Sequence, residues 1–405
     1  MFSTIQPAPP DPILGLTEAF RADANPAKIN LAVGVFKDAQ GHTPVLASVK
    51  AAEQRLVDSE TTKSYMPIDG SPTYGKLVQT MLFGSSHDIL STSRARTANT
   101  PGGTGALRVA ADYLAQNHPE ATVWLSDPTW ANHHGIFNAA GVKTQTYAYL
   151  DPQTNALDFD GVIASLQRLP AGDVVLLHGC CHNPTGVDPS PTQWQTIAET
   201  VADRGLLPLV DFAYQGFGVG LEEDAAGLRA VAEACDELLV CSSFSKNFGL
   251  YRERVGALTL VAQNSATADS VISQVKAVIR RNYSNPPAHG AEVVSTIMSD
   301  DAPGGLREQW ENELAAMRDR INDMRQAFKA GLDERGVKLT PRGNEFVTQQ
   351  NGMFTMSGLR KDHVEALREQ HAIYIVGSGR INVAGMTPSN LPVLCDAIAD
   401  VMQRG

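Results

Sequence analysis

LLVCSSFSKNFGL, residues 238–250, joins an apolar run to a cluster of hydroxyl side chains that surrounds a lysine. The run 238–241 is short, continuous and apolar, which is typical of a strand that is covered on both faces. Similar runs occur at 123–125, 174–177, 206–210 and 255–261, with turn residues or helical segments between them. This alternation predicts an α/β fold in which a mostly parallel sheet lies between helices.

Polar residues and glycines follow directly after several of the predicted strands. Asp127-Pro128, His178-Gly179 and Asp211 occupy such positions. In open α/β sheets, ligands bind beyond the carboxyl ends of the strands. We therefore expect these residues to converge on one site.

A different pattern begins near residue 310. Apolar residues recur at alternating three- and four-residue steps from Leu314 to Leu332, which predicts an amphipathic helix of about 20 residues. Predicted strands at 354–356 and 373–376 and a last helix from about residue 390 follow it. We therefore predict a large domain at 44–313, and an N-terminal arm and smaller α/β domain formed by 1–43 and 314–405.

Length and composition limit the class of protein. The chain has 405 residues, more than one hydrophobic core usually organises, which agrees with two domains. A net charge of −11 disfavours nucleic acid or an anionic membrane as the main partner, although a local basic pocket can still bind a small anion. The N-terminal residues do not resemble a secretory signal, and no run reaches the ~18 apolar residues of a membrane helix. We expect a cytoplasmic protein that binds neither nucleic acid nor a membrane.

The cysteines predict no disulfide framework. There are five, an odd number, and Cys180 and Cys181 are adjacent, so a reducing cytosol is the simpler setting. The stretch His178-Gly-Cys-Cys-His182 is a weak candidate for metal binding, because the chain has no CxxC and no second Cys/His pair at ligand spacing. We expect the cysteines to pack in the core, and we expect no metal.

Lys246 is the first candidate for chemistry. At the carboxyl edge of a sheet, its amine can form an imine with an aldehyde, and partial desolvation lowers its pKa so that it can also act as a base. Asp211 follows another strand and can hold a protonated pyridine nitrogen, which keeps such a ring an electron sink. Tyr214 lies three residues later. Read alone, Lys246 also fits a surface loop, and Asp211 fits a helix cap.

Residues 100–107, TPGGTGAL, open a predicted helix. Glycines and a hydroxyl at a helix N-terminus form an anion site from backbone N–H groups and the helix dipole. The stretch matches neither GxGxxG nor GxxxxGK[ST], so a monophosphate fits better than a dinucleotide. Arg254 can add a bidentate contact to the phosphate, and Asn183 can donate to a ring oxygen. The alternatives are an ion-paired surface arginine and a simple Asn-Pro turn.

Seven motifs extend these observations over nearly the whole chain. They are INLAVGVFKD, PGGTGALRVAAD, HGCCHNPTG, DFAYQGF, SFSKNFGLYRERVGAL, RRNYSNPPAHG and GRINVAGM. In these motifs and their order, the chain strongly resembles the class I aspartate/aromatic aminotransferases, which are fold-type-I pyridoxal-phosphate enzymes. The resemblance is strongest to the bacterial aspartate branch.

The resemblance implies pyridoxal 5′-phosphate as the cofactor and assigns a role to each matching residue. The catalytic residues would be Lys246, Asp211 and Tyr214. The cofactor-binding residues would be Lys246, Asn183, Asp211, Tyr214, Trp130, Gly103, Thr104, Ser243, Arg254 and, from the neighbouring subunit, Tyr65. The substrate-binding residues would be Gly34, Trp130, Asn183, Arg380 and Arg280.

Within these sets, the resemblance implies specific tasks. Lys246 would form a Schiff base with the cofactor and carry the proton. Asp211 would pair with the pyridinium nitrogen, with His133 as its partner. Arg380 would bind the substrate α-carboxylate, and Arg280 would reach across the interface of a homodimer to the distal carboxylate of a dicarboxylic substrate.

The implied reaction converts aspartate and 2-oxoglutarate into oxaloacetate and glutamate by a ping-pong mechanism. The alternative is an aromatic-amino-acid aminotransferase with dual specificity. Arg281 makes a double arginine reminiscent of that branch, whereas Thr104 and Asn285 resemble the aspartate branch. Phe36 and Phe244 replace common tyrosines, and Ala131 replaces a proline.

Two further alternatives fit the resemblance less well. Decarboxylation or C–S lysis does not explain two carboxylate anchors, Arg380 and Arg280. A binding protein on an inactive enzyme fold does not explain why Lys246, Asp211 and Arg380 are all present. Small amino acids and 2-oxo acids are therefore the expected substrates.

Overall fold

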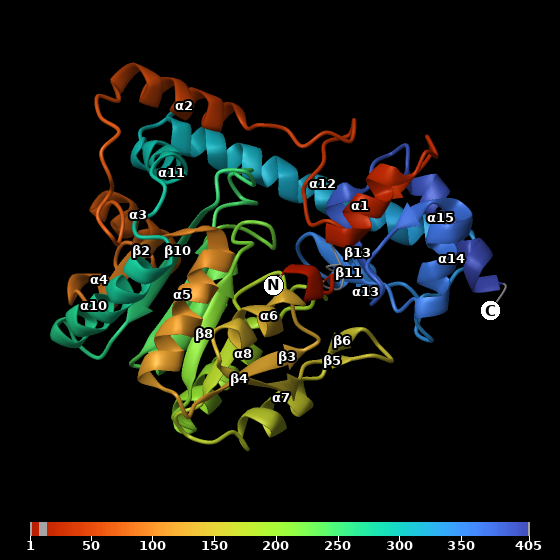
Figure 1. Cartoon of the computed structure of the whole chain (residues 1–405). Coiled ribbons are helices and arrows are strands. Elements are labelled where there is room, and N and C mark those ends of the chain that lie inside the picture. The colour runs from red at the N-terminus through yellow and green to blue at the C-terminus, as the bar shows by residue number, and fades with distance from the viewer. Residues whose placement is uncertain (1, 8–13, 404–405) are drawn as a thin grey trace.

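A seven-stranded sheet forms the centre of the computed structural model, which describes residues 2–7 and 14–403 (Figure 1). The strand order is β2-β10-β9-β8-β7-β3-β4. The strands are β2 (Ala95–Pro101), β3 (Thr122–Asp127), β4 (Lys143–Ala148), β7 (Val174–His178), β8 (Leu207–Phe212), β9 (Leu238–Ser243) and β10 (Val255–Val261). β10 runs antiparallel to both of its neighbours, and the other pairs are parallel. The predicted mostly parallel α/β sheet is confirmed.

Both faces of the sheet are buried, which explains the continuous apolar runs. In β9, Leu238 and Val240 belong to one hydrophobic cluster, whereas Leu239 and Cys241 belong to another on the opposite face. Helices α5 (Gly102–Asn117) and α10 (Ser265–Asn282) contribute to the second cluster. Helices α3 (Pro72–Phe83), α8 (Pro191–Asp203) and α9 (Ala226–Ala234) contribute to the clusters of the other face. A strand that is covered on both sides has no face exposed to water, so its sequence does not alternate between apolar and polar residues.

The long helix α12 (Leu306–Glu334) runs from the sheet region to the C-terminal elements (Figure 1). There β11 (Phe354–Met356) pairs antiparallel with β13 (Arg380–Asn382), and β1 (Ile29–Asn30) pairs parallel with β12 (Ile373–Tyr374). Helices α14 (Lys361–His371) and α15 (Leu391–Gln403) pack beside them. Residues 29–30 thus join the C-terminal elements in space. The predicted boundary at 313/314 falls inside α12, and the division into two domains stays a prediction.

The remaining elements are short or peripheral. They are η1 (Phe2–Thr4), α1 (Leu14–Ala22), α2 (Ala47–Ser59), α4 (Asp88–Ser91), α6 (Asn132–Ala139), β5 (Leu150–Asp151), β6 (Ala156–Leu157), α7 (Phe159–Leu166), η2 (Glu223–Ala225), α11 (His289–Ser299), α13 (Phe346–Gln349) and η3 (Val383–Gly385). None of the helices described is both long and apolar enough to cross a membrane.

Three differences from the sequence-based expectations have physical reasons. The strands β2 and β4 were not predicted, because ARTANTP and KTQTYA are mostly polar. Helix α12 is longer than predicted, since buried Leu306 and Trp310 continue its apolar stripe towards the N-terminus. The strand predicted at 373–376 pairs only at Ile373 and Tyr374.

Candidate active site

The carboxyl ends of β7, β8 and β9 and the N-terminus of α5 border a cavity of about 460 Å³. Most of the predicted site residues line it: Gly34, Gly103, Thr104, Trp130, Asn183, Asp211, Tyr214, Ser243, Lys246, Arg254 and Arg380. They come from segments far apart in the chain. The expectation that the residues after the strand ends converge on one site is therefore confirmed for Asp211, whereas Asp127, Pro128, His178 and Gly179 do not line the cavity. Asn183, from the loop after β7, lines it as well.

Lys246 projects from the turn after β9 into this cavity. Its Nζ lies 4.6 Å from the centroid of the Tyr214 ring. Desolvation by the surrounding protein lowers the pKa of Lys246 to about 8, with Asp211 opposing the shift and the charges of Arg254 and Arg380 adding to it. Roughly a tenth of the amine is therefore unprotonated at pH 7, far more than for an ordinary lysine, and a neutral amine is a nucleophile and a base.

The turn that carries Lys246 is held from α12. Trp310 donates its indole N–H to the backbone carbonyl of Asn247 at 2.8 Å, and its ring stacks on Phe248 at 4.1 Å between centroids. Gly249 has a φ of +64°, and its N–H donates to the Lys246 carbonyl at 3.0 Å. A residue with a side chain would be strained at that φ. The backbone that carries Lys246 is thus held by Trp310 of α12 and by the hydrogen bond within its own turn.

Asp211 lies near the end of β8, and its Oδ2 is 3.1 Å from Nε2 of buried His133. Burial raises the pKa of Asp211, but the hydrogen bond from His133 and the electrostatic influence of neighbouring groups, Lys246 among them, outweigh it, so the pKa lies below its usual value. Asp211 is therefore an anion at neutral pH. A carboxylate held in this way can pair with a protonated ring nitrogen.

A chain of hydrogen bonds behind Asp211 fixes the protonation of both histidines. The Asn183 backbone N–H donates to His178 Nδ1 at 3.4 Å, so Nε2 of that neutral ring is the donor to Thr129 Oγ1, at 3.3 Å. Burial lowers the pKa of His178 to about 3, which keeps it neutral. The Thr129 hydroxyl then donates to His133 Nδ1 at 2.7 Å, which leaves the proton of His133 on Nε2, facing Asp211. Thr129 was not predicted to take part, whereas His178 was expected near the site from its position after a strand end.

The N-terminus of α5 forms a tight cradle beside Arg254. Gly102 has a φ of +72°, and a Cβ on it would lie 2.5 Å from Arg254 Nη2. A Cβ on Gly103 would lie 3.0 Å from the Cβ of Ser243. Arg254 donates to Ser245 Oγ at 3.2 Å, and no carboxylate in the described part of the chain lies within ion-pair distance of it. Arg254 is exposed, as that alternative expected, but it forms no ion pair in the described residues, so the cradle offers an uncompensated positive charge to an anion.

Arg380 is buried at the start of β13. Its Nη1 donates to Asn183 Oδ1 at 3.0 Å and its Nη2 to the Ala32 carbonyl at 2.6 Å. The guanidinium carbon lies 4.3 Å from the centroid of the Phe354 ring, while a Cβ on Gly34 would lie 2.5 Å from that ring. Burial lowers the pKa of Arg380 to about 10, so the side chain remains a cation.

The charge of Arg380 is not neutralised by the described protein. No carboxylate lies within ion-pair distance of it in residues 2–7 and 14–403, and its Nε is buried without a hydrogen-bond partner. Burying a cation with an unpaired N–H donor costs free energy unless a ligand supplies a negative charge and a hydrogen-bond acceptor. The arrangement suits a carboxylate, which a guanidinium binds through two parallel hydrogen bonds.

Comparison with known proteins agrees with this geometry. A family model described as aminotransferase class I and II matches residues 26–398. The chain belongs to this family. It is 58% identical over 402 residues to the aspartate aminotransferase of Escherichia coli (strain K12), covering 99% of this chain and 100% of that one. It is 48% identical over 400 residues to the aromatic-amino-acid aminotransferase of Pseudomonas aeruginosa, covering 99% and 98%.

Solved structures extend the comparison to the fold of this aminotransferase. The aromatic-amino-acid aminotransferase from Burkholderia pseudomallei, covalently bound to pyridoxal phosphate, superposes with a TM-score of 0.94 at 45% identity and covers 99% of both chains. The cytoplasmic aspartate aminotransferase from Saccharomyces cerevisiae superposes with a TM-score of 0.95 at 37% identity and covers 100% of this chain and 99% of that one. The expected fold-type-I architecture is confirmed.

Tyr65 and Arg280 do not reach the cavity of their own subunit of the aminotransferase. Tyr65 is 92% exposed, and Arg280 is exposed at the end of α10, where it donates to Ser284 Oγ. The Ser284 hydroxyl donates to Asn285 Oδ1 at 3.0 Å, and Asn285 donates from Nδ2 to the Met66 carbonyl at 2.7 Å. The two predicted residues are therefore parts of one surface unit. Their role in a neighbouring subunit stays a prediction.

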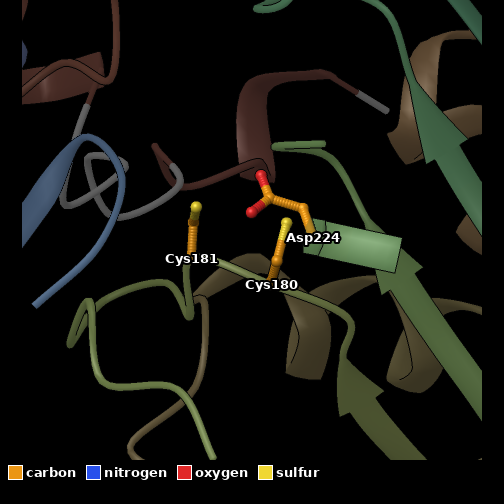
Figure 2. Close-up of side chains that lie close together, drawn as sticks. All are labelled: Cys180, Cys181 and Asp224. Atoms are coloured by element: carbon orange, nitrogen blue, oxygen red, sulfur yellow. The ribbon is translucent and has the colours of Figure 1, made fainter. Parts of the chain in front are cut away.

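The weak metal candidate near Cys180 has a different explanation. Figure 2 shows that the Cys180 and Cys181 side chains lie beside Asp224. The two sulfur atoms and a carboxylate oxygen of Asp224 lie within 4.8 Å of one another. Burial raises the pKa of Cys181 to about 12 and raises the pKa of Cys180 well above its usual value, so both remain thiols. Asp224 accepts four backbone N–H groups, from Gly216, Gly218, Val219 and Gly220. The cluster is a packed loop anchor whose carboxylate is already occupied.

The histidines of the same stretch are occupied too. His182 bonds Ser126 Oγ at 2.9 Å and Thr185 Oγ1 at 2.8 Å, and its ring stacks on Tyr149. Both nitrogens of His178 are bonded as described above. Neither ring has a nitrogen free for a metal.

Several residues line the cavity without having been predicted: Val33, Val35, Leu107, Ala131, Asn132, Ala213, Ser245, Tyr251 and Phe354. Ser245 and Tyr251 flank Lys246 and Arg254 within one motif, so their position in sequence was a usable signal. Phe354 carries no such signal, because only the pairing of β11 with β13 brings it under Arg380.

Proposed function

We propose that this aminotransferase transfers the amino group of aspartate to 2-oxoglutarate by a ping-pong mechanism, with pyridoxal 5′-phosphate as its cofactor. The products are oxaloacetate and glutamate. The observation that carries the proposal is a buried, unpaired Arg380 in the same cavity as Lys246 and Asp211. Identity of 58% to an aspartate aminotransferase along the whole chain supports aspartate as the substrate.

The residues that line the cavity fit this cofactor. Gly103, Thr104, Ser243 and Arg254 would hold its phosphate. Asp211 would pair with the protonated ring nitrogen, Asn183 and Tyr214 would bond the ring oxygen, and Trp130 would cover the ring face. The free positive charge of Arg254 beside the α5 N-terminus supports the phosphate end, and the ionised Asp211 supports the nitrogen end. When bound, the cofactor links covalently to an amine and draws electrons from the substrate α-carbon.

The chain's own residues then determine which bond breaks. Arg380 holds the α-carboxylate in a fork, next to the backbone of Gly34. The carboxylate is thereby kept in place, and the α-carbon–hydrogen bond is presented to Lys246. Lys246 Nζ removes that proton and later returns it, for which a pKa near neutrality is suited. His133 keeps Asp211 charged throughout.

The quaternary structure and location complete the proposal. The enzyme is a cytoplasmic homodimer in which Tyr65 contacts the phosphate, and Arg280 the distal carboxylate, in the partner subunit's site. Support comes from the surface unit that joins these two residues outside their own cavity. The division into a large domain, 44–313, and a small one, 1–43 with 314–405, belongs to the same proposal.

Substrate preference decides between this function and an aromatic-amino-acid aminotransferase. The second candidate is favoured by relatives such as the Pseudomonas aeruginosa enzyme at 48% identity. The test measures kcat/KM for aspartate and phenylalanine with 2-oxoglutarate as acceptor. We expect aspartate to be preferred by at least about tenfold, the effect of one charged hydrogen-bonded contact. A preference for phenylalanine would establish the second candidate instead.

A further inference from the structure

Arg325 is a cation in the interior of the protein that has no role in the proposed chemistry. It lies on α12 and is 1% exposed. No carboxylate in the described ranges, 2–7 and 14–403, lies within ion-pair distance of it. Burial lowers its pKa to about 10, so it is still charged at neutral pH. A buried charge without an ion-pair partner costs free energy unless other polar groups bond to it.

The partners of Arg325 are backbone carbonyls of a single segment, 347–354. Nη1 donates to the Val347 carbonyl at 3.0 Å. Nη2 lies 3.2 Å from the Asn351 carbonyl, 2.8 Å from that of Gly352 and 2.6 Å from that of Phe354. The segment leads from α13 to β11 and is folded around the guanidinium. One side chain thus bonds carbonyls of α13, of the start of β11 and of the turn between them.

The same segment is bound on its other side to the loop that carries Asn183. The Asn351 N–H donates to the Gly186 carbonyl at 2.7 Å, and its side chain donates to Asp188 Oδ2 at 3.2 Å. A Cβ on Gly186 would lie 2.6 Å from the Phe354 carbonyl oxygen, so the two chains pack without a gap. Movement of the segment would therefore displace Asn183 or Phe354.

Phe354 and Asn183 are two of the groups that position Arg380. Phe354 lies under the guanidinium of Arg380, and Asn183 accepts its hydrogen bond. A path of direct contacts thus leads from Arg325 through the Phe354 segment to the free donor of Arg380. Arg325 touches neither the cavity nor Arg380 itself.

We propose that Arg325 is a positioning residue of the substrate-carboxylate site, which it holds in shape through the carbonyls of the segment ending at Phe354. The proposal rests on the function proposed above, in which Arg380 binds the α-carboxylate. It predicts that loss of Arg325 weakens carboxylate binding much more than cofactor binding. A neutral side chain at this position leaves several carbonyls without donors, so the segment relaxes.

The test measures binding of succinate, a plain dicarboxylate, to the holoenzyme by titration calorimetry. We expect Arg325→Gln to weaken succinate binding by about tenfold, the scale of lost charge-assisted hydrogen bonds. The affinity for the cofactor should change much less than the affinity for succinate. Arg325→Lys, which keeps the charge and some donors, should give a smaller loss and carries the test if Arg325→Gln does not fold. Arg318→Gln is the matched control, since Arg318 also donates from α12 to a carbonyl, that of Gly216.

A double-mutant cycle separates positioning from general destabilisation. Phe354→Leu removes the ring under Arg380 while Arg325 is intact. If Arg325 acts through Phe354, the double variant loses much less succinate affinity than the sum of the single losses. Additive losses would overturn the proposal, as would equal weakening of succinate and cofactor binding. If Arg325→Gln does not fold, the same cycle is measured with Arg325→Lys, and additive losses overturn the proposal there too.

Arg380→Ala distinguishes this proposal from the function on which it rests. If Arg380→Ala loses succinate affinity and Arg325→Gln does not, only the role of Arg325 is overturned. If Arg380→Ala binds succinate as the wild type does, the carboxylate site itself is wrong, and the role of Arg325 falls with it.

Discussion

Arg380 donates a hydrogen bond of 3.0 Å to the side-chain oxygen of Asn183, a residue 197 positions away in the sequence. The contact also orients the amide, whose nitrogen lies 3.4 Å from the Tyr214 hydroxyl. It joins β13 to the loop after β7, and both ends line the cavity. Arg380, the proposed anchor of the substrate carboxylate, is thus connected to the large sheet at the edge of the cavity.

This contact predicts the effect of Asn183→Ala. Arg380 would lose one of its two acceptors, and its cationic group would keep only the Ala32 carbonyl. Hydrogen bonds to charged groups contribute about 1.5–3 kcal/mol, so we expect KM for aspartate to rise by about tenfold or more. Steady-state kinetics over a range of aspartate concentrations measure it. Asn117→Ala, at the opposite end of α5 from the cavity, is the control, and an unchanged KM in Asn183→Ala would contradict the assignment.

The large sheet was predictable because its strands are apolar on both faces. Five of the seven strands were recognised from such runs, since burial between two helical layers removes polar residues. The edge strand β4 has only Tyr147 buried, and its sequence therefore looks like a loop. β2 is polar at Arg96, Thr97 and Asn99 because its side chains bond neighbouring elements.

The site was predictable only where its residues belong to short motifs. Lys246, Asp211 and Arg254 lie at or near strand ends or in one motif, so strand positions and the family resemblance singled them out, and all three line one cavity while their roles stay predictions. Thr129 and Arg325 belong to no such pattern, and their partners are a distant side chain and backbone carbonyls. A carbonyl has no side-chain identity, so no sequence pattern reveals such contacts.

The shifted pKa of Lys246 predicts how the apoenzyme takes up its cofactor. The neutral amine is the reactive form, and its fraction rises with pH until it passes the pKa of about 8. Below that value we expect the rate of covalent cofactor uptake to rise by about tenfold per pH unit, and above it to level off. Stopped-flow absorbance of the reconstituting protein follows this rate. A rate that kept rising to pH 10 would show an ordinary lysine.

The control for the pH profile is Asp211→Asn. The carboxylate of Asp211 favours the charged form of Lys246, so its removal should move the midpoint of the profile to lower pH. A midpoint that moved upward would contradict the electrostatic explanation.

Glu313 predicts a stability effect far from the cavity. This residue of α12 accepts the Ala47 N–H at 2.7 Å and the Ser48 N–H at 3.3 Å, and so caps α2 across 266 positions of sequence. Leu46, the residue before the helix, provides no side-chain cap. Glu313→Ala should therefore lower the free energy of unfolding by about 1 kcal/mol, the usual loss for an N-cap. Chemical denaturation measures it, with Glu311→Ala, which pairs with Arg307 on the surface, as the control.

Sharing of active sites predicts that two inactive chains restore activity together. One chain carries Lys246→Ala and Arg254→Ala and lacks cofactor chemistry. The other carries Tyr65→Phe and Arg280→Asp and lacks the residues that it would lend to its partner. In a mixed dimer, one site combines the second chain's own cavity with intact Tyr65 and Arg280 from the first. We expect activity on aspartate after co-refolding, measured against each variant alone. An active monomer by light scattering would exclude sharing.

Arg280 should determine the preference for a dicarboxylic substrate. A guanidinium binds a carboxylate by two charge-assisted hydrogen bonds, and such a contact is worth about 10- to 150-fold in kcat/KM. An aromatic substrate gains nothing from it and must displace the charge. Arg280→Ala should therefore reduce kcat/KM for aspartate strongly and leave phenylalanine unchanged or improved.

The neighbouring Arg281 provides a matched control for this experiment. It donates to Gln116 Oε1 at 2.6 Å and to the Ala277 carbonyl at 3.1 Å, so its guanidinium is bound to its own subunit. Arg280 bonds only Ser284 among the partners found in the described chain, which leaves most of its donors for a ligand. Arg281→Ala should therefore change neither substrate's kcat/KM. If Arg280→Ala weakens aspartate and phenylalanine equally, Arg280 does not select the substrate, and the preference for aspartate loses its main physical support.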